Sequence, residues 1–449
     1  MPWSRWHASS FPAGALLRIL HTSDWHLGVS TGPASRVEEQ REFLRWLHDT
    51  LASREVDALI VAGDIFDTMH PSSEVQELYY GFLASLGDSG VRDVVVIGGN
   101  HDSASRLDAP SALLKAVNVH VVGGVPPADV RAERMVAPLR TRGGDGPGAI
   151  CLAVPYAHEY RLGIRTTDLD KSQTREEFQR VFGELYSDLA DAAEAEHPGV
   201  PIVATGHLTL GFGATREDYP QEIHRVGQIE GLPTDIIDPR IRYMALGHIH
   251  RCYQIDRSQA WYCGTPVPYS LTEMGARRRV LLVDLEGEGD PTVEAIEVPR
   301  QRDLLKLEGS PDVVVAALAS MTWSTPMAPL VHVVAESQMA QPGLQRRLSE
   351  AAVRTDDAGA PVSGPVLVEV RQRVTAVERG TSTAPLPPLD RLAPEDVFGL
   401  MCDATQLEGE PRAQIFDAFR RVASADPQTI KEMVDDIPLP PLADGGGAS

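Results

Sequence analysis

Five short segments of this chain place metal-ligating side chains directly after apolar runs that have the composition of β-strands. The segments are D-x-H at 24–26, G-D-x-x-D at 63–67, G-N-H-D at 99–102, G-H at 206–207 and G-H-x-H at 247–250. In an α/β sheet, ligand sites lie at the carboxyl ends of the strands. Glycines before the polar residues allow tight turns and a close approach of the backbone. The pattern therefore predicts an α/β fold in which the five segments converge.

The converging segments carry enough oxygen and nitrogen ligands for two divalent ions. A mixture of carboxylate, amide and imidazole groups suits manganese, iron or zinc better than calcium. A dinuclear site needs a bridging ligand, and the two oxygens of the Asp64 carboxylate make it the natural candidate. Two metal ions about 3.5–4 Å apart commonly activate water against a phosphate ester. The predicted metal ligands are Asp24, His26, Asp64, Asn100, His207, His248 and His250.

His101 and Asp102 are the candidates for acid–base chemistry at this centre. His101 follows Asn100, so its imidazole could face the scissile phosphate and protonate the leaving alkoxide. Asp102 could orient that imidazole, as carboxylates often do. Taken singly, each segment has a plain structural explanation, such as an ordinary turn, a buried histidine or a helix cap at Asp67. Five such segments in order, each after a strand, favour a metal centre.

The first 300 residues alternate apolar strands with helical patterns. Runs of consecutive apolar residues predict strands that are covered on both faces. We expect a catalytic domain over residues 18–300, preceded by a disordered extension at 1–17 and closed by hairpins near 261–263, 279–284 and 292–298. Strands are predicted at 17–21, 58–62, 94–97, 119–122, 150–154, 202–205 and 243–246, and helices at 37–51, 74–86 and 109–117.

The remainder of the chain changes character. A β-α-β-α-β pattern predicts a small α/β domain at 301–375, and a stretch rich in Pro, Ser and Thr predicts a linker at 376–393. Short helices are expected at 394–402 and 412–423, in a segment (394–436) that is too small to fold alone. Its apolar face would pack either on its own chain or on a partner, and a disordered tail would follow at 437–449. The β-α-β-α-β elements are expected at 304–307, 311–320, 330–334, 343–353 and 366–370.

The charge of the chain limits how it could hold a polyanion. With 41 basic and 63 acidic residues, the formal net charge is −22. A protein that binds nucleic acid by bulk electrostatics should be basic. If DNA is the substrate, metal ions, a partner, or arginine clusters such as 240/242 and 277–279 must offset the acidity.

The four cysteines show no zinc spacing, no apolar run is long enough to span a membrane, and no signal peptide is predicted. We therefore expect a cytoplasmic protein.

The motif order resembles that of the calcineurin-like metallophosphoesterases. The sequence that flanks the motifs is similar to that of one branch, the SbcD family of nuclease subunits from bacterial SbcC–SbcD DNA-repair complexes. The resemblance runs from residue 18 to about 423 and is more specific in the catalytic domain. The segments that carry it are LHTSDWHLG (20–28), VAGDIFDT (61–68), GGNHDS (98–103), ATGHLT (204–209), ALGHIHR (245–251), YCGTPVPYS (262–270) and LAPEDVF (392–398).

The resemblance implies a fold and a division of the ligands. The fold would be an α/β two-sheet metallophosphoesterase sandwich flanked by helices, with a small α+β capping domain and C-terminal helices. Asp64 would bridge the two metals, and His101 would be the catalytic histidine. Other branches carry a second functional histidine where this chain has Asp67. One metal would be held by Asp24, His26, Asp64 and His250, and the other by Asp64, Asn100, His207 and His248.

The resemblance also implies partners and an activity. The family cleaves DNA ends and hairpins with manganese, as exonuclease and endonuclease, in DNA repair, recombination and replication. It forms a homodimer, here through helices near 74–86 and 106–117, and its C-terminal helices bind an SbcC-type ATPase. The small domain would cap the site and help to select DNA. Two alternatives stay open, namely a phosphodiesterase or phosphatase for small molecules and a non-catalytic clamp subunit.

Overall fold

The computed structural model describes two compact units, Met1–Thr375 and Ala376–Ser449. The described residues are 16–374, except 145, 165–169, 212–230, 269, 288 and 357, together with 395, 398–399, 402 and 409–424. The predicted linker at 376–393, the tail at 437–449 and nearly all of the 1–17 extension lie outside these residues. Most of the predicted helix at 394–402 also lies outside them.

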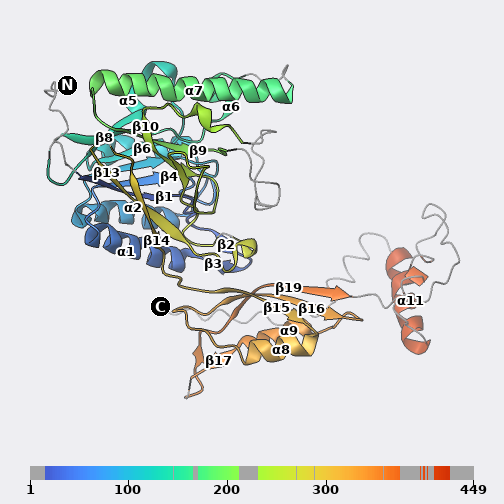
Figure 1. Cartoon of the computed structure of the whole chain (residues 1–449). Coiled ribbons are helices and arrows are strands. Elements are labelled where there is room, and N and C mark those ends of the chain that lie inside the picture. Colours follow the sequence, from blue (N-terminus) through green and yellow to red (C-terminus); the bar gives the residue numbers. More distant parts are fainter. Residues whose placement is uncertain are drawn as a thin grey trace. The chain divides into compact units, whose positions relative to one another are not determined.

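Two six-stranded sheets form the larger part of the first unit (Figure 1). The first sheet has the order β14-β13-β1-β4-β5-β6, in which β1, β4, β5 and β6 are parallel. Its strands span Leu16–Thr22 (β1), Ala58–Ala62 (β4), Asp93–Ile97 (β5), Val119–Val122 (β6), Arg279–Glu286 (β13) and Thr292–Glu297 (β14).

The second sheet has the order β11-β12-β10-β9-β8-β7, with β8, β9, β10 and β12 parallel. The two sheets share one hydrophobic core, since buried side chains of both belong to a single cluster. This architecture confirms the predicted two-sheet α/β fold. The strands span Val136–Arg140 (β7), Pro147–Leu152 (β8), Ile202–His207 (β9), Ile241–Gly247 (β10), Tyr253–Gln254 (β11) and Ala260–Tyr262 (β12).

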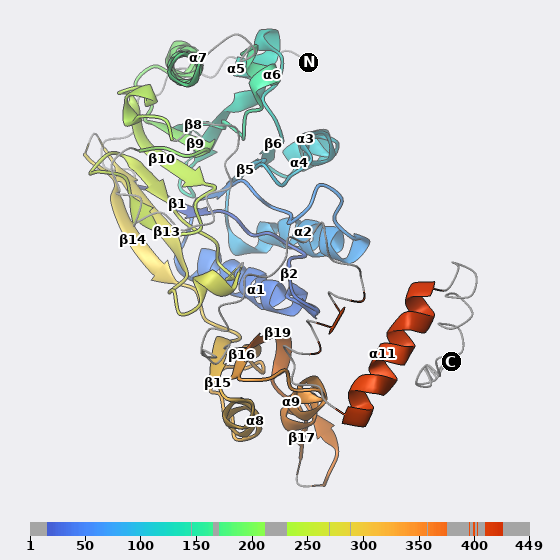
Figure 2. The ribbon, with the colours of Figure 1, turned by 90° about the vertical axis from the view of Figure 1, so that its right-hand side faces the viewer.

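Helices cover both outer sides of the sandwich. In Figures 1 and 2, α1 (Val37–Ser53) and α2 (Ser73–Ser85) lie beside the first sheet, and α7 (Lys171–Glu196) lies beside the second. The sequence analysis did not predict α7, because charged residues surround its narrow apolar stripe of Phe178, Phe182, Leu185, Tyr186 and Leu189. A capping box at its start is the signal that marks it, since the Asp170 carboxylate accepts the backbone N–H of Ser172 and Gln173.

One predicted helix is shorter in the structure. The segment expected as a helix at 109–117 contains only α4 (Ser111–Lys115), and a separate helix, α3 (Ala104–Asp108), precedes that segment. Pro110 lies between the two helices and starts α4 later than predicted, because proline lacks an N–H group and its ring clashes with a preceding helical turn. The other short helices are α5 (Arg131–Met135), α6 (Glu159–Leu162) and the 3-10 helices η1 (Leu86–Ser89), η2 (Ala128–Val130), η3 (Thr234–Ile236) and η4 (Leu271–Glu273).

The β-α-β-α-β pattern forms a third, parallel sheet of order β15-β16-β19. A separate apolar cluster that includes Val314, Leu318, Val333 and Leu348 joins its helices to its strands. The elements lie where they were predicted, whereas the independence of 301–375 as a domain stays a prediction. They span Leu304–Gly309 (β15), Pro311–Ala319 (α8), Leu330–Ser337 (β16), Leu344–Ala352 (α9) and Val366–Val374 (β19), with small hairpins at Arg354–Thr355 (β17) and Pro361–Val362 (β18) and at Ser30–Thr31 (β2) and Ala34–Ser35 (β3).

The second unit contains α11 (Gly409–Ser424), which includes the helix predicted at 412–423. Phe398 stacks on Phe419, with ring centroids 4.1 Å apart, and meets Phe416 edge to face. Ile415 on the same helix is 44% exposed. Some of the apolar side chains of this segment therefore pack on one another, and others remain at the surface.

Gly247 should be intolerant of a side chain. A Cβ atom there would lie 1.9 Å from the carbonyl oxygen of Ala62 on β4, which belongs to the other sheet. We expect Gly247→Ala to cost about 1–3 kcal/mol or more in the free energy of unfolding, because backbone must move to make room. Chemical denaturation monitored by circular dichroism measures this loss.

Gly183→Ala is the matched control. Gly183 lies within α7, and a Cβ atom there would meet no heavy atom within 4 Å. We expect this change to stabilise the protein by about 0.5–1 kcal/mol, the usual gain for alanine over glycine in a helix. Equal effects of the two substitutions would contradict the steric argument.

Candidate metal centre

The loops that follow β1 and β4 are held side by side beyond the ends of their strands. The N–H of Asp24 donates to the carbonyl of Gly63 at 3.0 Å, and the N–H of His26 donates to the carbonyl of Asp64, also at 3.0 Å. The parallel pairing of the two strands therefore continues into the loops. Asp24, His26 and Asp64 are placed by backbone hydrogen bonds rather than by flexible side chains.

The second sheet reaches this edge through glycine contacts. A Cβ atom on Gly63 would lie 2.2 Å from Nδ1 of His207, and one on Gly99 would lie 2.1 Å from Oδ1 of Asp64. The Nδ1–H of His207 donates to the carbonyl of Ala62 at 2.9 Å, which links β9 to β4. Glycine is needed at position 63 because the two sheets come too close there for any side chain, and at position 99 because the loop after β5 lies against Asp64 in the loop after β4 of the same sheet.

Four of the predicted ligands have backbone angles in the left-handed region. The φ angles are 51° at Asp24, 43° at His26, 49° at Asp64 and 91° at His248. Non-glycine residues rarely adopt such angles, and they cluster at functional sites where the surrounding structure holds them. Hydrogen bonds supply that hold, because Asp24 Oδ1 accepts the N–H of His248 at 2.8 Å and Asp64 Oδ1 accepts the N–H of His101 at 2.9 Å.

The structure brings all seven predicted ligands together, in two sets. In the first set, ligand atoms of Asp24, His26 and His250 lie within 4.8 Å of one another, with 3.2 Å between the two Nε2 atoms. In the second set, Oδ1 of Asn100 lies 3.1 Å from Nε2 of His207 and 3.0 Å from Nδ1 of His248.

Asp64 stands between the two sets. Its Oδ2 atom is 3.6 Å from Nε2 of His26 in the first set and 3.3 Å from Nε2 of His207 in the second. This position is the one expected for a bridging carboxylate. Ligand atoms of Asp64 also lie within 4.8 Å of those of Asp24 and His207, and within 4.8 Å of those of His26 and His101.

These residues fit a pair of divalent cations. Asp24, His26, Asp64 and His207 are each at most 2% exposed, so two carboxylates are buried among imidazoles. Buried charge is costly unless it is paired or coordinates a metal. The mixed oxygen and nitrogen donors suit a transition metal such as manganese, iron or zinc.

The electrostatics of the cluster favour a proton on His207. Burial alone would lower the pKa of this imidazole, but the carboxylates of Asp64 and Asp24 and the carbonyl of Ala62 raise the pKa to about 9. Burial likewise opposes charge on Asp64, yet the neighbouring imidazoles, His207 first, hold the pKa of its carboxyl well below its usual range. The carboxylates thus attract positive charge into the space between the two sets.

His101 lies against the first set, but Asp102 does not orient it, contrary to the prediction. The Nδ1–H of His101 donates to the backbone carbonyl of Asp67 at 2.8 Å, and its ring meets the ring of His26 edge to face at 4.8 Å. Since a carbonyl can only accept a hydrogen bond, Nδ1 carries the hydrogen, and Nε2 is the atom through which His101 would exchange a proton.

Asp102 instead fastens two loops. Its carboxylate accepts the N–H groups of Ile65 (3.0 Å), Phe66 (3.0 Å) and Gly99 (2.8 Å). Burial and the nearby Asp64 carboxylate raise the pKa of Asp102 to about 6, although these N–H donors oppose the rise. The predicted catalytic role of Asp102 is therefore replaced by a structural one, because its oxygens are directed at backbone amides.

One neighbour of the centre was not predicted from the sequence. The Nδ1 atom of His250 lies 2.7 Å from Oε1 of Glu273, which is 23 positions further along the chain and outside every motif. Among the histidines without motif support, His70 is exposed, and His21 and His120 make hydrogen bonds to groups outside the candidate ligand set. His21 is buried with its Nδ1 2.9 Å from the Tyr243 hydroxyl, and His120 bonds the carbonyl of Arg134, while His224 lies outside the described residues.

Comparisons of the sequence with known proteins point to one family. The family model described as calcineurin-like phosphoesterase matches residues 17–252, which include all seven ligands. The SbcD subunits of the nuclease SbcCD from Rhodobacter capsulatus and Escherichia coli K12 are 36% and 34% identical to this chain. The alignments cover 65% and 67% of this chain and 71% and 73% of those proteins.

This chain belongs to the SbcD family of calcineurin-like phosphoesterases. The Bacillus subtilis member is 31% identical over 65% of this chain and 72% of its own length. The chain is therefore a metal-dependent phosphoesterase, as its motifs predicted. Among the described residues, no helix is both long and apolar enough to cross a membrane.

Metal binding should release protons and should strengthen as the pH rises. His207 must lose a proton before Nε2 can bind a cation, and its raised pKa of about 9 keeps that proton in place at neutral pH. Apparent Mn²⁺ affinity should therefore increase with pH until the pH passes about 9. Calorimetric titration in buffers of different ionisation enthalpy counts the released protons. Heats that are the same in every buffer would argue against this account.

Proposed function

We propose that this chain is the nuclease subunit of an SbcCD-type complex and hydrolyses phosphodiester bonds of DNA with two metal ions. One observation carries the proposal: seven candidate ligands lie in two sets that share Asp64, in a chain whose relatives are named as SbcD subunits of the nuclease SbcCD. Manganese is the proposed metal, and cleavage of duplex ends and of hairpins is the proposed activity. A cytoplasmic location follows from this role.

Each protein group near the centre has a distinct proposed role. The chemistry that a bound pair of divalent cations supplies is polarisation of the phosphate and activation of water. The doubly protonated His101 ring donates a proton from Nε2 to the leaving alkoxide, and the Asp67 carbonyl accepts the Nδ1–H that the ring keeps before and after this transfer. Asp102 keeps the loops after β4 and β5 in register and does not meet the substrate.

Three of the arginines that were considered for DNA binding form ion pairs within the protein. Arg240 pairs with Asp238 and Asp191, Arg278 pairs with Glu273, and Arg277 lies 3.5 Å from Glu297. With a net charge of −22, this chain needs positive charge from elsewhere to hold a polyanion. We infer that bound cations and the partner subunit supply it.

The proposed partners are a second copy of this chain and an SbcC-type ATPase. We place the dimer contact at the helices near 74–86 and 106–117, and the ATPase contact at the C-terminal helices. The exposed Ile415 on α11 supports the second contact, because a short helix with an uncovered apolar side chain is suited to docking. The small sheet would cap the centre and help to select DNA. A phosphodiesterase for small molecules needs neither the small sheet nor these helices.

A cleavage assay tests the proposed activity. The full chain would be incubated with Mn²⁺ and a labelled hairpin duplex, with and without the ATPase, in parallel with a small phosphodiester. We expect DNA cleavage, and His101→Ala should lower its rate by roughly 10²–10⁴-fold, the usual contribution of a general acid. Metal content, measured by elemental analysis, should be the same in both proteins.

Two outcomes of that assay would count against the proposal. Intact DNA in every condition, together with rapid hydrolysis of the small phosphodiester, would favour the small-molecule enzyme. Full activity of His101→Ala would remove the assigned role of His101 while leaving the nuclease assignment in place. His120→Ala is the matched control, since the His120 imidazole bonds a backbone carbonyl away from the centre.

Truncation tests the ATPase contact. Deletion of the residues after 390 should abolish co-purification of the ATPase and leave hydrolysis of a simple phosphodiester unchanged, because all seven ligands lie between residues 24 and 250. Size-exclusion chromatography of the mixed proteins measures the association. Persistent co-elution of the truncated chain with the ATPase would move the contact to another surface.

A further inference from the structure

The ligand His250 is held by a carboxylate rather than by the backbone. Its Nδ1 atom is 2.7 Å from Oε1 of Glu273, and its Nε2 atom faces Nε2 of His26 at 3.2 Å. A hydrogen bond from Nδ1–H to the carboxylate places the lone pair on Nε2, where a cation would bind. Carboxylates in this position orient a metal-binding imidazole and raise its basicity.

Arg278 fixes both members of this pair. Its Nη2 donates to Oε2 of Glu273 at 2.6 Å and to the carbonyl of Glu273 at 3.1 Å, and its Nη1 donates to the carbonyl of His250 at 3.0 Å. The Arg278 side chain is only 8% exposed, so these bonds are shielded from water. One guanidinium therefore sets the distance between the histidine and its carboxylate.

The segment that carries Glu273 is anchored on the small sheet. Leu271 and Met274, on either side of Glu273, pack against a cluster of buried residues that joins the β2–β3 hairpin to the starts of the three parallel strands. Movement of the small sheet would therefore reach the Glu273 carboxylate through two nearby residues. The buried members of this cluster are Ala34, Leu304, Leu330 and Val368.

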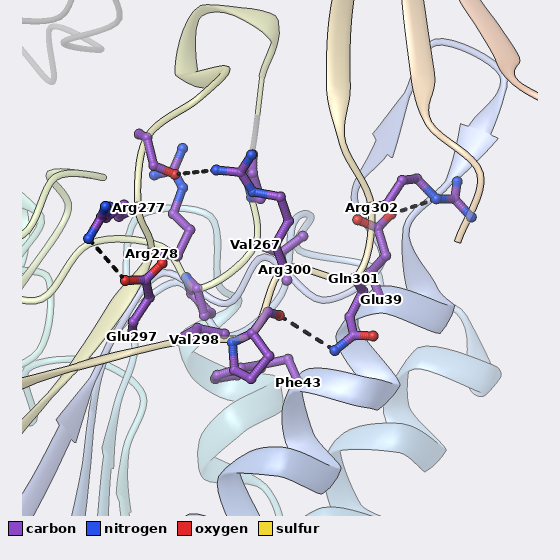
Figure 3. Close-up of a pocket in the computed structure, with 14 residues that line it drawn as sticks. Glu39, Phe43, Val267, Arg277, Arg278, Glu297, Val298, Arg300, Gln301 and Arg302 are labelled. Carbon is purple, nitrogen blue, oxygen red and sulfur yellow. Dashed lines mark hydrogen bonds and ion pairs between the residues drawn. The ribbon is translucent and has the colours of Figure 1, made fainter. Parts of the chain in front are cut away.

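A neighbouring ion pair provides a comparison. Arg277 and Arg278 both line a pocket between β14 and the start of the small sheet, together with Glu39, Arg300 and Arg302 (Figure 3). In that pocket Arg277 pairs with Glu297 at 3.5 Å, and both side chains are more than half exposed. Exposed pairs of this kind contribute little to stability. Glu297 thus matches Glu273 in chemistry but has no bond to a candidate ligand in the contacts described.

We propose that Glu273, locked by Arg278, is the positioning residue for His250 and so controls one of the two cation sites selectively. The proposal rests on the proposed function only in requiring that the centre binds two cations. His207, in the other set, is oriented by the Ala62 carbonyl, so its site does not depend on Glu273. The histidine of one site is consequently oriented by a side-chain carboxylate, and that of the other by a backbone carbonyl.

Mn²⁺ titration of the full chain tests this proposal. Calorimetry and electron paramagnetic resonance would be applied to the wild type, Glu273→Gln, Arg278→Lys and Glu297→Gln. In Glu273→Gln we expect one Mn²⁺ to bind roughly 10–100-fold more weakly, which is the usual effect of removing a group that hydrogen-bonds to a metal ligand. The second Mn²⁺ should keep its affinity. The spectrum at two equivalents of Mn²⁺ should change from that of a coupled pair to that of isolated ions.

The other variants separate positioning from general stability. Arg278→Lys keeps the positive charge but loses the planar array of N–H donors of the guanidinium. It should therefore weaken Mn²⁺ binding at the same site, by a smaller factor than Glu273→Gln does. Glu297→Gln should match the wild type. Glu297→Gln should also keep the wild-type melting temperature, whereas Glu273→Gln leaves the buried Arg278 without its charged partner and should melt lower in the metal-free state. Positioning is therefore recognised by the selective loss of one site.

Two results would overturn the proposal. Wild-type affinities at both sites in Glu273→Gln would show that the carboxylate is not needed. Equal loss at both sites together with a lower melting temperature would show a structural role instead. If the wild type itself bound no Mn²⁺, the proposed function would fail, and this result is distinct from either of the first two.

Discussion

The contact between the two sheets at their carboxyl edges is the constraint on which the rest of the structure depends. The sheets can meet there only because Gly63 and Gly247 present no side chain, and His207 then reaches the carbonyl of Ala62 across the gap. Ligands from five loops fall within a few ångströms of one another as a result. A wider separation would keep the same residues but would leave two incomplete half-sites.

The convergence of the ligands has a cost in strain and in buried charge. Four ligands hold backbone angles that their residue types rarely adopt, and two carboxylates are removed from water. The backbone hydrogen bonds from Gly99, Ile65 and Phe66 to Asp102 help to hold the loops in this arrangement. Asp102 thus contributes to the centre through loop geometry rather than by orienting His101.

Sequence reasoning predicted the features that depend on neighbouring residues in the chain. Apolar runs followed by glycine and a ligand are visible in the chain, so the strands and the seven converging residues could be named. Contacts that depend on tertiary distance could not. Glu273 meets His250 only because the chain returns through η4, and Asp102 turns toward amides of the loop after β4. Helix α7 was missed because its apolar stripe is narrow, and the helix predicted at 109–117 starts only after Pro110, whose effect on the helix start was overlooked.

The two-sheet origin of the ligands also bears on the order of events in folding. Asp24 and His248, which share a hydrogen bond, are 224 positions apart in the chain. Closing so long a loop early is entropically unfavourable, so the contact forms after the local βαβ units. The centre is therefore completed late, by a polypeptide that already has its native topology. A cation would act as a clamp on the finished fold, adding stability by mass action, rather than as a nucleus around which the chain collapses.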